Sequence, residues 1–316
     1  MAIKKLWSIG GGKGGIGKSI FTLGLGITLA KMGHKIILID ADLGGANLHT
    51  LMGVRYPPHT LEDFILKRVD RLEDIIIETQ VEGIGLICGA DDIMGAANPK
   101  FVQKIRLLNQ LEDLPADLVL LDLGAGTSFN VLDFFNYSAG KIAVFTNQST
   151  ALQNVYGFIK SALFRFLSRE FSRDDEVLLL LQQAGSRLAR LHSIQDILTL
   201  LKEKNPEKYA RLQQSVDRFA IYLVVNMVKT ELDRKAAQVI QKVCHDFLDL
   251  KPHILGSLAY DPEVEKAVNQ MLPFPSRSQE TPAALGLQSI AAQVLKAAHL
   301  DDMTTAPQLA ATGAWG

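Results

Sequence analysis

Short, almost wholly apolar runs alternate along the chain with longer segments in which apolar residues recur every three or four positions. A continuous apolar run suits a strand covered on both faces, whereas the longer period suits an amphipathic helix. The alternation predicts an α/β fold with a mostly parallel central sheet flanked by helices. The predicted strands are Leu6–Ile9, Lys35–Asp40, Ile84–Cys88, Leu118–Asp122, Lys141–Thr146, Phe219–Asn226 and Ile254–Leu258.

A predicted helix follows the glycine-rich loop directly, and further helices are predicted along the chain. The first runs to about Met32, where Gly33 supplies a residue suited to the left-handed end of a helix. The other helices of the predicted sheet fold are Pro99–Glu112, Phe129–Ala139, Ala151–Ser168, Glu231–Phe247, Pro262–Gln270 and Pro282–Ala298.

The connection between the helix ending near Ser168 and the strand opening at Phe219 is unusually long. It holds about 50 residues, whereas an ordinary connection of this kind holds roughly 2–6. Three segments within it have the apolar period of helices: Asp174–Ala184, Ser193–Lys204 and Pro206–Asp217. We therefore predict a helical insertion over residues 169–218.

The domain boundaries follow from the length of the chain and the pattern at its end. A chain of 316 residues is near the upper size that one hydrophobic core sustains. We interpret residues 1–298 as a single domain that includes the insertion. Residues 299–316 have no apolar period and predict a loose C-terminal tail.

Composition narrows the class of protein. The net charge is −1, so no overall positive field exists to hold nucleic acid. The two cysteines, Cys88 and Cys244, lie far apart and predict buried thiols, not a disulfide framework or a metal site. No apolar run reaches the length of a membrane span, and we expect no cleavable leader before the glycine-rich loop. We expect a cytoplasmic protein.

The segment from Gly12 to Ser19 satisfies the pattern G-x-x-x-x-G-K-[ST]. A loop of this kind, placed between a strand and a helix, wraps nucleotide phosphates with its backbone N–H groups. Lys18 is expected to reach the β- and γ-phosphates, and the Ser19 hydroxyl to hold Mg²⁺. The predicted nucleotide contacts of the loop are Gly12, Gly14, Gly15, Ile16, Gly17, Lys18, Ser19 and Ile20.

Three aspartates follow the ends of predicted strands. Asp40 and Asp42 are separated by one residue and face the same side, toward the expected phosphates, where carboxylates suit metal and water. Asp122 ends an apolar strand in the Walker B pattern, in which the carboxylate binds Mg²⁺ directly or through water. Gly124 and Gly126 would then allow a mobile switch. The predicted metal site comprises Ser19, Asp40 and Asp122.

The form Lys13-Gly14-Gly15-x-Gly17-Lys18-Ser19 resembles the deviant Walker A motif of the MinD/ParA class of P-loop ATPases. The resemblance implies a P-loop NTPase fold, ATP and Mg²⁺ as cofactors, and an ATP-dependent homodimer in which Lys13 reaches the partner's nucleotide. It implies that Asp42 positions or activates the attacking water and that Asp40 supports the water shell of the metal. The catalytic residues so implied are Lys13, Lys18 and Asp42.

The same resemblance implies which residues contact the base of the nucleotide. The strand that ends at Asn226 is similar to the adenine-contacting strand of the family, which implies that this side chain bonds the base. Tyr260 and Asp261 would pass beside the ring with their backbone groups. The alternative for Asn226, a turn residue at a strand end, stays open.

Details of the motifs separate the branches of the family. The pattern D-x-D-x-G-x-x-N, from Asp40 to Asn47, is similar to the MinD and FlhG branch, because ParA proteins typically carry Pro-Gln within it. The Gly-Ala-Gly after Asp122 resembles FlhG-like sequences, although Leu123 replaces their usual threonine. No Lys or Arg follows Lys296, so a basic C-terminal membrane anchor is not expected.

A second candidate for membrane association is the segment Phe158–Arg173, in which aromatic residues accompany Arg165, Arg169 and Arg173 at helical spacing. The competing interpretation is a core helix with a solvated arginine face, and we favour it. Association at the membrane surface or the cell pole is therefore left open.

The resemblance implies a MinD/FlhG-type ATPase, in which ATP drives dimerisation and a partner triggers hydrolysis to ADP and phosphate. Its output would be the position or number of flagella, the division site or other polar machinery. The insertion 169–218 is expected to contact the unidentified regulatory partner. The alternatives are a ParA-like partitioning ATPase, a low-turnover nucleotide-dependent interaction module, and a metal-cluster ATPase, which the settings of Cys88 and Cys244 disfavour.

Overall fold

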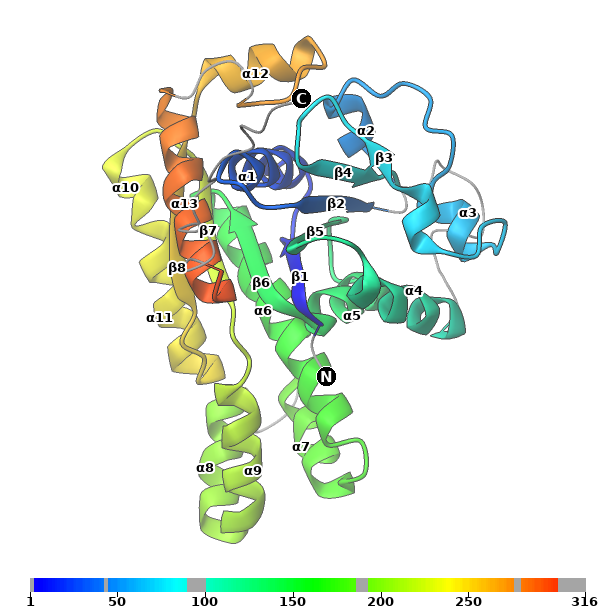
Figure 1. Ribbon diagram of the computed structural model, residues 1–316. Coiled ribbons are helices and arrows are strands. Elements are labelled where there is room, and N and C mark those ends of the chain that lie inside the picture. Colours follow the sequence, from blue (N-terminus) through cyan, green and yellow to red (C-terminus); the bar gives the residue numbers. More distant parts are fainter. Residues whose placement is uncertain (1–2, 43–44, 90–100, 186–192, 276–279, 301–316) are drawn as a thin grey trace, which may run out of the picture.

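The computed structural model describes residues 3–42, 45–89, 101–185, 193–275 and 280–300 (Figure 1). Its centre is an eight-stranded sheet in the order β3-β4-β2-β5-β1-β6-β7-β8. All neighbouring strands run parallel except β3 and β4. The strands are β1 (Ile3–Gly10), β2 (Ile36–Ala41), β3 (Ile77–Glu78), β4 (Ile84–Ile87), β5 (Leu118–Leu123), β6 (Ser138–Phe145), β7 (Tyr222–Val228) and β8 (His253–Ala259). The prediction of a mostly parallel sheet is confirmed.

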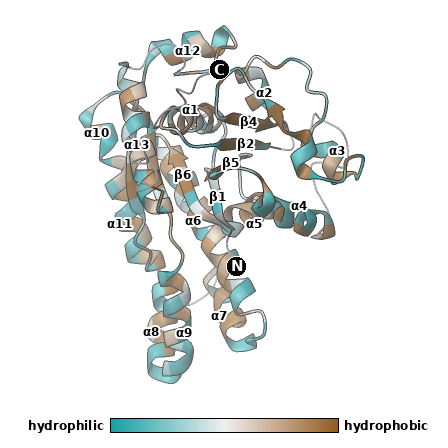
Figure 2. Ribbon diagram, in the orientation of Figure 1, coloured by the Kyte–Doolittle hydropathy of each residue, from teal (hydrophilic) through white to brown (hydrophobic). Residues whose placement is uncertain are grey.

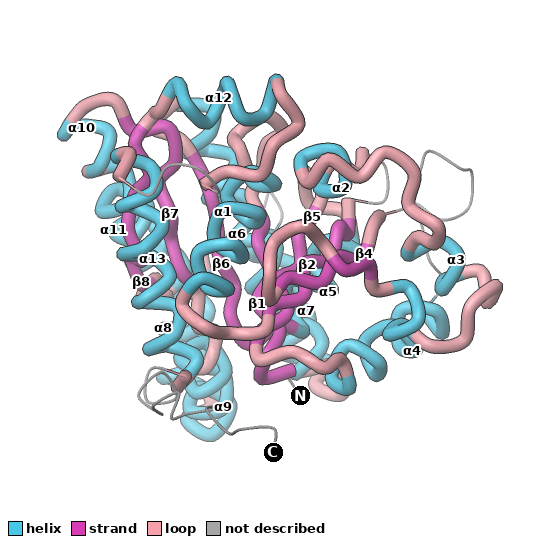
Figure 3. The backbone as a smooth tube through the Cα atoms, turned by 45° about the horizontal axis from the view of Figure 1, so that its top comes forward, coloured by secondary structure: helices cyan, strands magenta, loops and turns pink. Residues whose placement is uncertain are grey.

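Helices cover both faces of the sheet (Figures 1 and 3). One apolar cluster joins the sheet to α1, α2 and α13, and a second joins it to α3–α9 and α11. The helices are α1 (Lys18–Lys31), α2 (Leu48–Leu51), α3 (Leu61–Ile65), η1 (Leu72–Ile75), α4 (Phe101–Asp113), α5 (Phe129–Tyr137), α6 (Ser149–Glu170), α7 (Asp175–Gly185), α8 (Ile194–Lys204), α9 (Pro206–Asp217), α10 (Glu231–Arg234), α11 (Ala236–Leu248), α12 (Pro262–Asn269) and α13 (Pro282–Ala298).

The double cover explains the continuous apolar runs. Along β2, Ile37 and Ile39 join one apolar cluster, while Ile36 and Leu38 join the other. Because side chains alternate between the faces of a strand, every residue of such a strand is buried. Figure 2 shows these hydrophobic strands enclosed between helices whose outer faces are more hydrophilic. None of the described helices combines the length and the apolar character that a membrane-spanning segment needs.

The three helices predicted in the long connection are present as α7, α8 and α9. They project from the end of the molecule opposite α1 and α12 (Figures 1 and 3). Val177, Leu201 and Leu212 are buried in the apolar cluster that also contains residues of α6 and α11. The insertion therefore shares its core with the sheet domain. From residue 301 onward, the predicted loose tail lies outside the described residues.

Some element boundaries differ from the prediction. The helix expected over Glu231–Phe247 is two helices that meet at Lys235, because Thr230 and Asp233 form a capping box around a separate first turn. The helix expected over Phe129–Ala139 ends at Tyr137, since Ser138 already belongs to β6. The short elements α2, α3, η1 and β3 had not been predicted.

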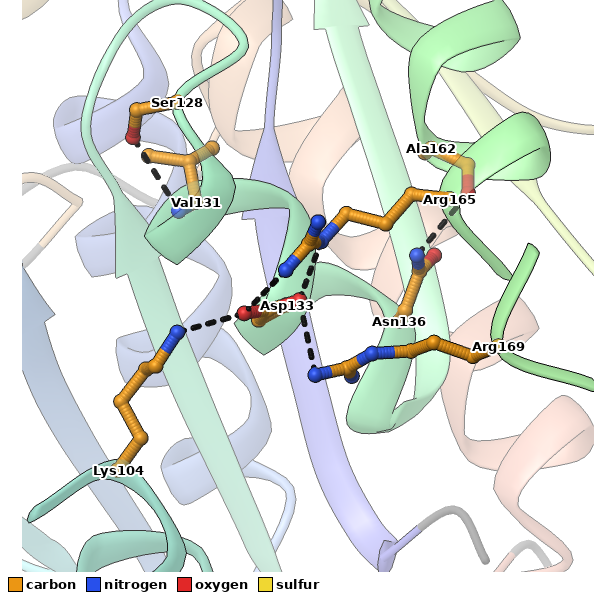
Figure 4. A network of polar contacts seen from close by, with 8 residues as sticks. All are labelled: Lys104, Ser128, Val131, Asp133, Asn136, Ala162, Arg165 and Arg169. Carbon is orange, nitrogen blue, oxygen red and sulfur yellow. Dashed lines mark hydrogen bonds and ion pairs between the residues drawn. The ribbon is translucent and has the colours of Figure 1, made fainter. Parts of the chain in front are cut away.

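One buried carboxylate ties three helices together (Figure 4). Asp133 of α5, only 1 % exposed, accepts hydrogen bonds from Lys104 of α4 at 2.7 Å and from both Nε and Nη2 of Arg165 in α6. Arg169, one turn further along α6, lies 3.3 Å from the same carboxylate. These cations hold the pKa of Asp133 below its usual value, against the effect of burial.

The same contacts settle the interpretation of the segment Phe158–Arg173. Arg165 and Arg169 bind Asp133, and their guanidinium groups also lie over the rings of Phe129 and Tyr137. On the same segment, Phe158, Leu163, Leu167 and Phe171 are buried. The segment is a core helix followed by the start of the insertion, as favoured above.

Asp133→Ala should lower the free energy of unfolding by about 3 kcal/mol, because it leaves the partly buried cations without their carboxylate. Urea denaturation measures the change. Asp246→Ala is the matched control, because Asp246 pairs with Lys242 on an exposed face of α11, where an ion pair contributes about 0.5 kcal/mol. Equal losses in the two variants would contradict the assignment of Asp133 as the residue that joins α4, α5 and α6.

Candidate nucleotide site at the carboxyl ends of the strands

The phosphate loop connects β1 to α1, as predicted. Gly17 caps α1 in the left-handed region, with φ 81°, and Lys18 and Ser19 open the helix. The conformation of Gly17 favours glycine, and it places the N-terminus of α1 toward the loop, where backbone N–H groups can bind phosphate. Lys18 is 8 % exposed, and its carbonyl oxygen accepts a hydrogen bond from Thr22.

Lys13 lies apart from Lys18. Its ammonium group donates to the hydroxyl of Thr150, 3.2 Å away in the first turn of α6. The two lysines of the motif thus lie in different environments: Lys18 is buried at the start of α1, and Lys13 is half-buried against α6. Of the remaining predicted loop residues, Gly14 to Gly17 lie between the two lysines in the sequence, Gly12 directly precedes Lys13, and Ile20 lines a neighbouring cavity.

Asp122 and Asp40 stand side by side, because β2 and β5 pair with these two residues in register. Both carboxyl groups are almost fully buried. Asp122 accepts hydrogen bonds from Thr22, at 3.1 Å, and from Ser19. Burial, with the nearby charge of Asp40 adding to it, raises the pKa of Asp122 to about 7.

Asp40 holds the segment that follows β2. Its carboxylate accepts hydrogen bonds from the backbone N–H groups of Asp42 at 3.1 Å, Asn47 at 2.7 Å and Leu48 at 2.9 Å. Burial raises the pKa of Asp40 to about 6, and these bonds oppose the rise. The sequence pattern did not predict this structural role, which only the return of the chain at α2 creates.

Asp42 is half-buried and meets the residues that follow β5. A Cβ atom on Gly124 would lie 2.9 Å from Oδ1 of Asp42, so a larger residue there would displace this carboxylate. The segment that follows β2 therefore touches the segment after β5 that was predicted to be a mobile switch. Leu43 and Gly44, which belong to the pattern from Asp40 to Asn47, lie outside the described residues.

The donor set suits a magnesium ion shared with phosphates. Among the described residues no group of three or more His, Cys, Asp or Glu side chains could hold a metal alone. Mg²⁺ is usually bound by one or two carboxylates together with water and substrate phosphates. The Ser19 hydroxyl and the Asp122 carboxylate adjoin one another, and a cation beside them would offset the cost of burying Asp122 and Asp40.

A cavity of about 250 Å³ lies beside the start of α1. Apolar side chains form most of its wall, and its polar residues are Asn226, Tyr260, Asp261 and Glu265. The structure thus brings the three predicted base-contacting residues together. Asn226 is also bound to the phosphate loop, because its Nδ2 donates to the Ile16 carbonyl oxygen at 2.8 Å. Tyr260 is 45 % exposed at the rim, beneath the ammonium group of Lys229.

Sequence comparison agrees with this geometry. The family model described as the CobQ/CobB/MinD/ParA nucleotide binding domain matches residues 7–274. The chain belongs to this family. The resemblance inferred from Lys13 and the phosphate loop is therefore confirmed, and with it a nucleotide-binding domain.

Two relatives belong to flagellar systems by name. The chain is 27 % identical to antiactivator FleN of Pseudomonas aeruginosa, over 91 % of this chain and 85 % of FleN. It is 33 % identical to the flagellum site-determining protein YlxH of Helicobacter pylori, over 49 % of this chain and 53 % of YlxH. The septum site-determining protein MinD of Pyrococcus horikoshii, solved with Mg-ADP, has the same fold: the TM-score is 0.61 at 22 % identity, over 94 % of this chain and 98 % of MinD.

The buried aspartates predict a pH dependence for the nucleotide-free protein. Because the folded state raises the pKa of Asp122 from 3.8 to about 7, the native carboxyl group holds a proton that the unfolded chain releases. The free energy of unfolding should therefore fall as the pH rises from about 4 to 7. Denaturant titrations across this range measure the slope.

Asp122→Asn should flatten this pH dependence and stabilise the nucleotide-free protein near neutral pH, because it removes a buried charge. The same variant should lose the Mg²⁺-dependent part of its ADP affinity. Asp117→Asn is the control, because Asp117 precedes the same strand at its far, partly exposed end. An unchanged slope in Asp122→Asn would refute the assignment.

Proposed function

We propose that the chain is an ATP-dependent dimerising switch of the MinD/FlhG type that hydrolyses ATP to ADP and phosphate. The observation that carries the proposal is the meeting of the phosphate loop with Asp40, Asp42 and Asp122 at one edge of the sheet. This arrangement supplies phosphate binding, carboxylates for a metal, and a carboxylate for the attacking water in one place.

Each residue has a part in the proposed reaction. The loop N–H groups and Lys18 hold the phosphates, and Ser19, Asp40 and Asp122 hold Mg²⁺ or its water shell. Mg²⁺ would neutralise charge on the phosphate oxygens. Asp42 positions the water that attacks the γ-phosphorus, the bond to the β-phosphate oxygen breaks, and ADP leaves. Gly124 allows Asp42 to approach the second switch, so each nucleotide state can favour a different arrangement of the two segments.

Lys13 is the proposed link to the second subunit. Among the described residues, the hydroxyl of Thr150 is the one hydrogen-bond partner of its ammonium group, and the side chain is half-buried. A lysine in this position is free to leave Thr150 at small cost, because a hydrogen bond of this kind contributes about 1 kcal/mol. In the dimer it would supply charge to the partner's phosphates, much as an arginine finger does.

The process controlled is proposed from the relatives. FleN and YlxH carry flagellar names, and the chain aligns with FleN over most of both lengths. We therefore favour control of flagellar position or number, by a cytoplasmic protein that can gather at the membrane surface or the cell pole. Placement of the division site is the next candidate, because MinD of Synechocystis is 28 % identical over 60 % of this chain.

Lys13→Ala should abolish an ATP-dependent dimer, whereas Asp42→Ala should retain the dimer and slow phosphate release by about 100-fold or more. Light scattering with ATP and Mg²⁺ gives the mass, and a phosphate assay gives the rate. Lys242→Ala, on the exposed face of α11, is the control for loss of a lysine. A dimer that forms equally without nucleotide would contradict the switch.

The same assays test the alternatives. A low-turnover interaction module would release no phosphate in the wild type or in Asp42→Ala, even with its partner present. A ParA-like partitioning ATPase would bind DNA in a salt-sensitive way and lose this binding when surface lysines and arginines are replaced.

The insertion is the proposed contact for the regulatory partner. Since its buried side chains belong to the domain core, surface changes test it better than deletion. Glu203→Arg with Glu207→Arg reverses two exposed charges where α8 meets α9. In an Asp42→Ala background with ATP, this variant should fail to retain a protein that the unchanged insertion captures, while ATP affinity stays within about twofold.

Glu78→Arg with Glu82→Arg is the matched control, because it reverses two exposed charges beside β3 and β4. If this pair abolishes capture and the insertion pair does not, the partner contacts another face.

A further inference from the structure

Thr22 of α1 has a buried hydroxyl group with two acceptors in reach. Its Oγ1 lies 3.0 Å from the carbonyl oxygen of Lys18 and 3.1 Å from Oδ1 of Asp122, and the residue is 0 % exposed. A threonine hydroxyl carries one hydrogen, so it can donate to only one of these two oxygens at a time. The choice of acceptor decides whether Thr22 supports the helix alone or also the carboxylate at the end of β5.

The carboxylate has the greater need of this hydrogen. Lys18 opens α1, so its carbonyl oxygen also accepts the backbone N–H four residues further on, in the regular pattern of a helix. The carboxylate of Asp122 is 1 % exposed and stands beside Asp40 in the paired strands. Water cannot replace a donor that such a buried group loses. Donation to Asp122 is therefore the more stabilising of the two contacts.

Thr28 shows how a buried threonine of the same helix bonds where no carboxylate is near. It is 4 % exposed, and its hydroxyl donates to the carbonyl oxygen of Gly24 at 2.7 Å. Among the described residues that carbonyl is the one acceptor of its hydroxyl. This bond to the preceding turn is the ordinary one for threonine within a helix. Thr22 differs by its second contact, which joins α1 to β5.

A second donor to Asp122 matters because Ser19 has another task. The Ser19 hydroxyl bonds the same carboxylate, and it is also a proposed ligand of Mg²⁺. An oxygen engaged by the cation is less able to hold Asp122 in place, whereas Thr22 stays one turn away inside the helix. Mg²⁺ requires near-ideal octahedral geometry, and hydrogen bonds to a ligating carboxylate fix its orientation.

We propose that Thr22 is a positioning residue for the magnesium site: its hydroxyl donates to Oδ1 of Asp122 and fixes the carboxylate in the orientation that serves Mg²⁺ or its water shell. The inference rests on the proposed function, because it assumes that a Mg²⁺-nucleotide occupies the phosphate loop. Thr22 itself is assigned no contact with the nucleotide or the metal. Loss of its hydroxyl should therefore weaken the contribution of Mg²⁺ and spare the binding of the nucleotide alone.

Calorimetric titration with ADP, once with Mg²⁺ and once with EDTA, gives the factor by which Mg²⁺ strengthens ADP binding. Thr22→Val keeps nearly the same shape and removes the hydroxyl. It should reduce this factor by about 10-fold, the order expected of one hydrogen bond to a charged group. The ADP affinity in EDTA should stay at the wild-type value. Thr22→Ser retains the hydroxyl and should retain the factor.

Thr28→Val is the matched control, because the same substitution in the same helix removes a hydroxyl that bonds the backbone. It should leave the Mg²⁺ factor and the affinity in EDTA unchanged. Thr22→Ala removes the hydroxyl without adding a methyl group in its place, so the test does not depend on the folding of one variant.

Three results would overturn the inference: a wild-type Mg²⁺ factor in Thr22→Val and Thr22→Ala, an equal loss in Thr28→Val, or loss of ADP binding in EDTA in both Thr22 variants, which would make Thr22 a residue of the fold only. A wild-type protein that binds no ADP, or binds it equally with Mg²⁺ and with EDTA, would instead refute the proposed nucleotide site, and the inference with it.

Discussion

The pairing of β2 with β5 places two carboxylates, Asp40 and Asp122, next to each other in a nearly dry environment. Neither carboxylate can be charged there without help, and the surroundings supply it. Ser19 and Thr22 donate to Asp122, and backbone N–H groups donate to Asp40. A cation bound beside the two carboxylates would reduce the remaining free-energy cost of burying them. The start of α1 and the segment that follows β2 are therefore organised around this one pair.

Helix α6 joins this site to the insertion formed by α7, α8 and α9. Its first turn accepts Lys13 through Thr150, and its last turns contact α5 through Asp133 before the chain enters the insertion. The 22 residues of α6 thus touch the phosphate loop at one end and lead to α7 at the other. The site is built on rigid elements, while the residues expected to change with nucleotide lie on the loops between them.

Local patterns predicted the sheet and the phosphate loop well, since burial on both faces leaves continuous apolar runs and the glycine spacing has a specific mechanism. Contacts between residues that are far apart in the sequence leave no such local pattern. The contact of Asp133 with Lys104 and Arg165 joins residues about 30 positions away on either side, and the bond from Asn226 to Ile16 joins residues 210 positions apart in the sequence. The burial of Asp261 at the edge of the cavity follows from the path of α12, which the sequence pattern does not reveal.

The central claim is that two copies of the chain complete each other's nucleotide sites, with Lys13 acting across the interface. Its most direct test is the rate of ATP hydrolysis per subunit as a function of protein concentration, with and without added Lys13→Ala protein. The account predicts a specific rate that rises with concentration to a plateau and is reduced when the variant forms mixed dimers with the wild type. A specific rate independent of concentration, and unaffected by the variant, would contradict it.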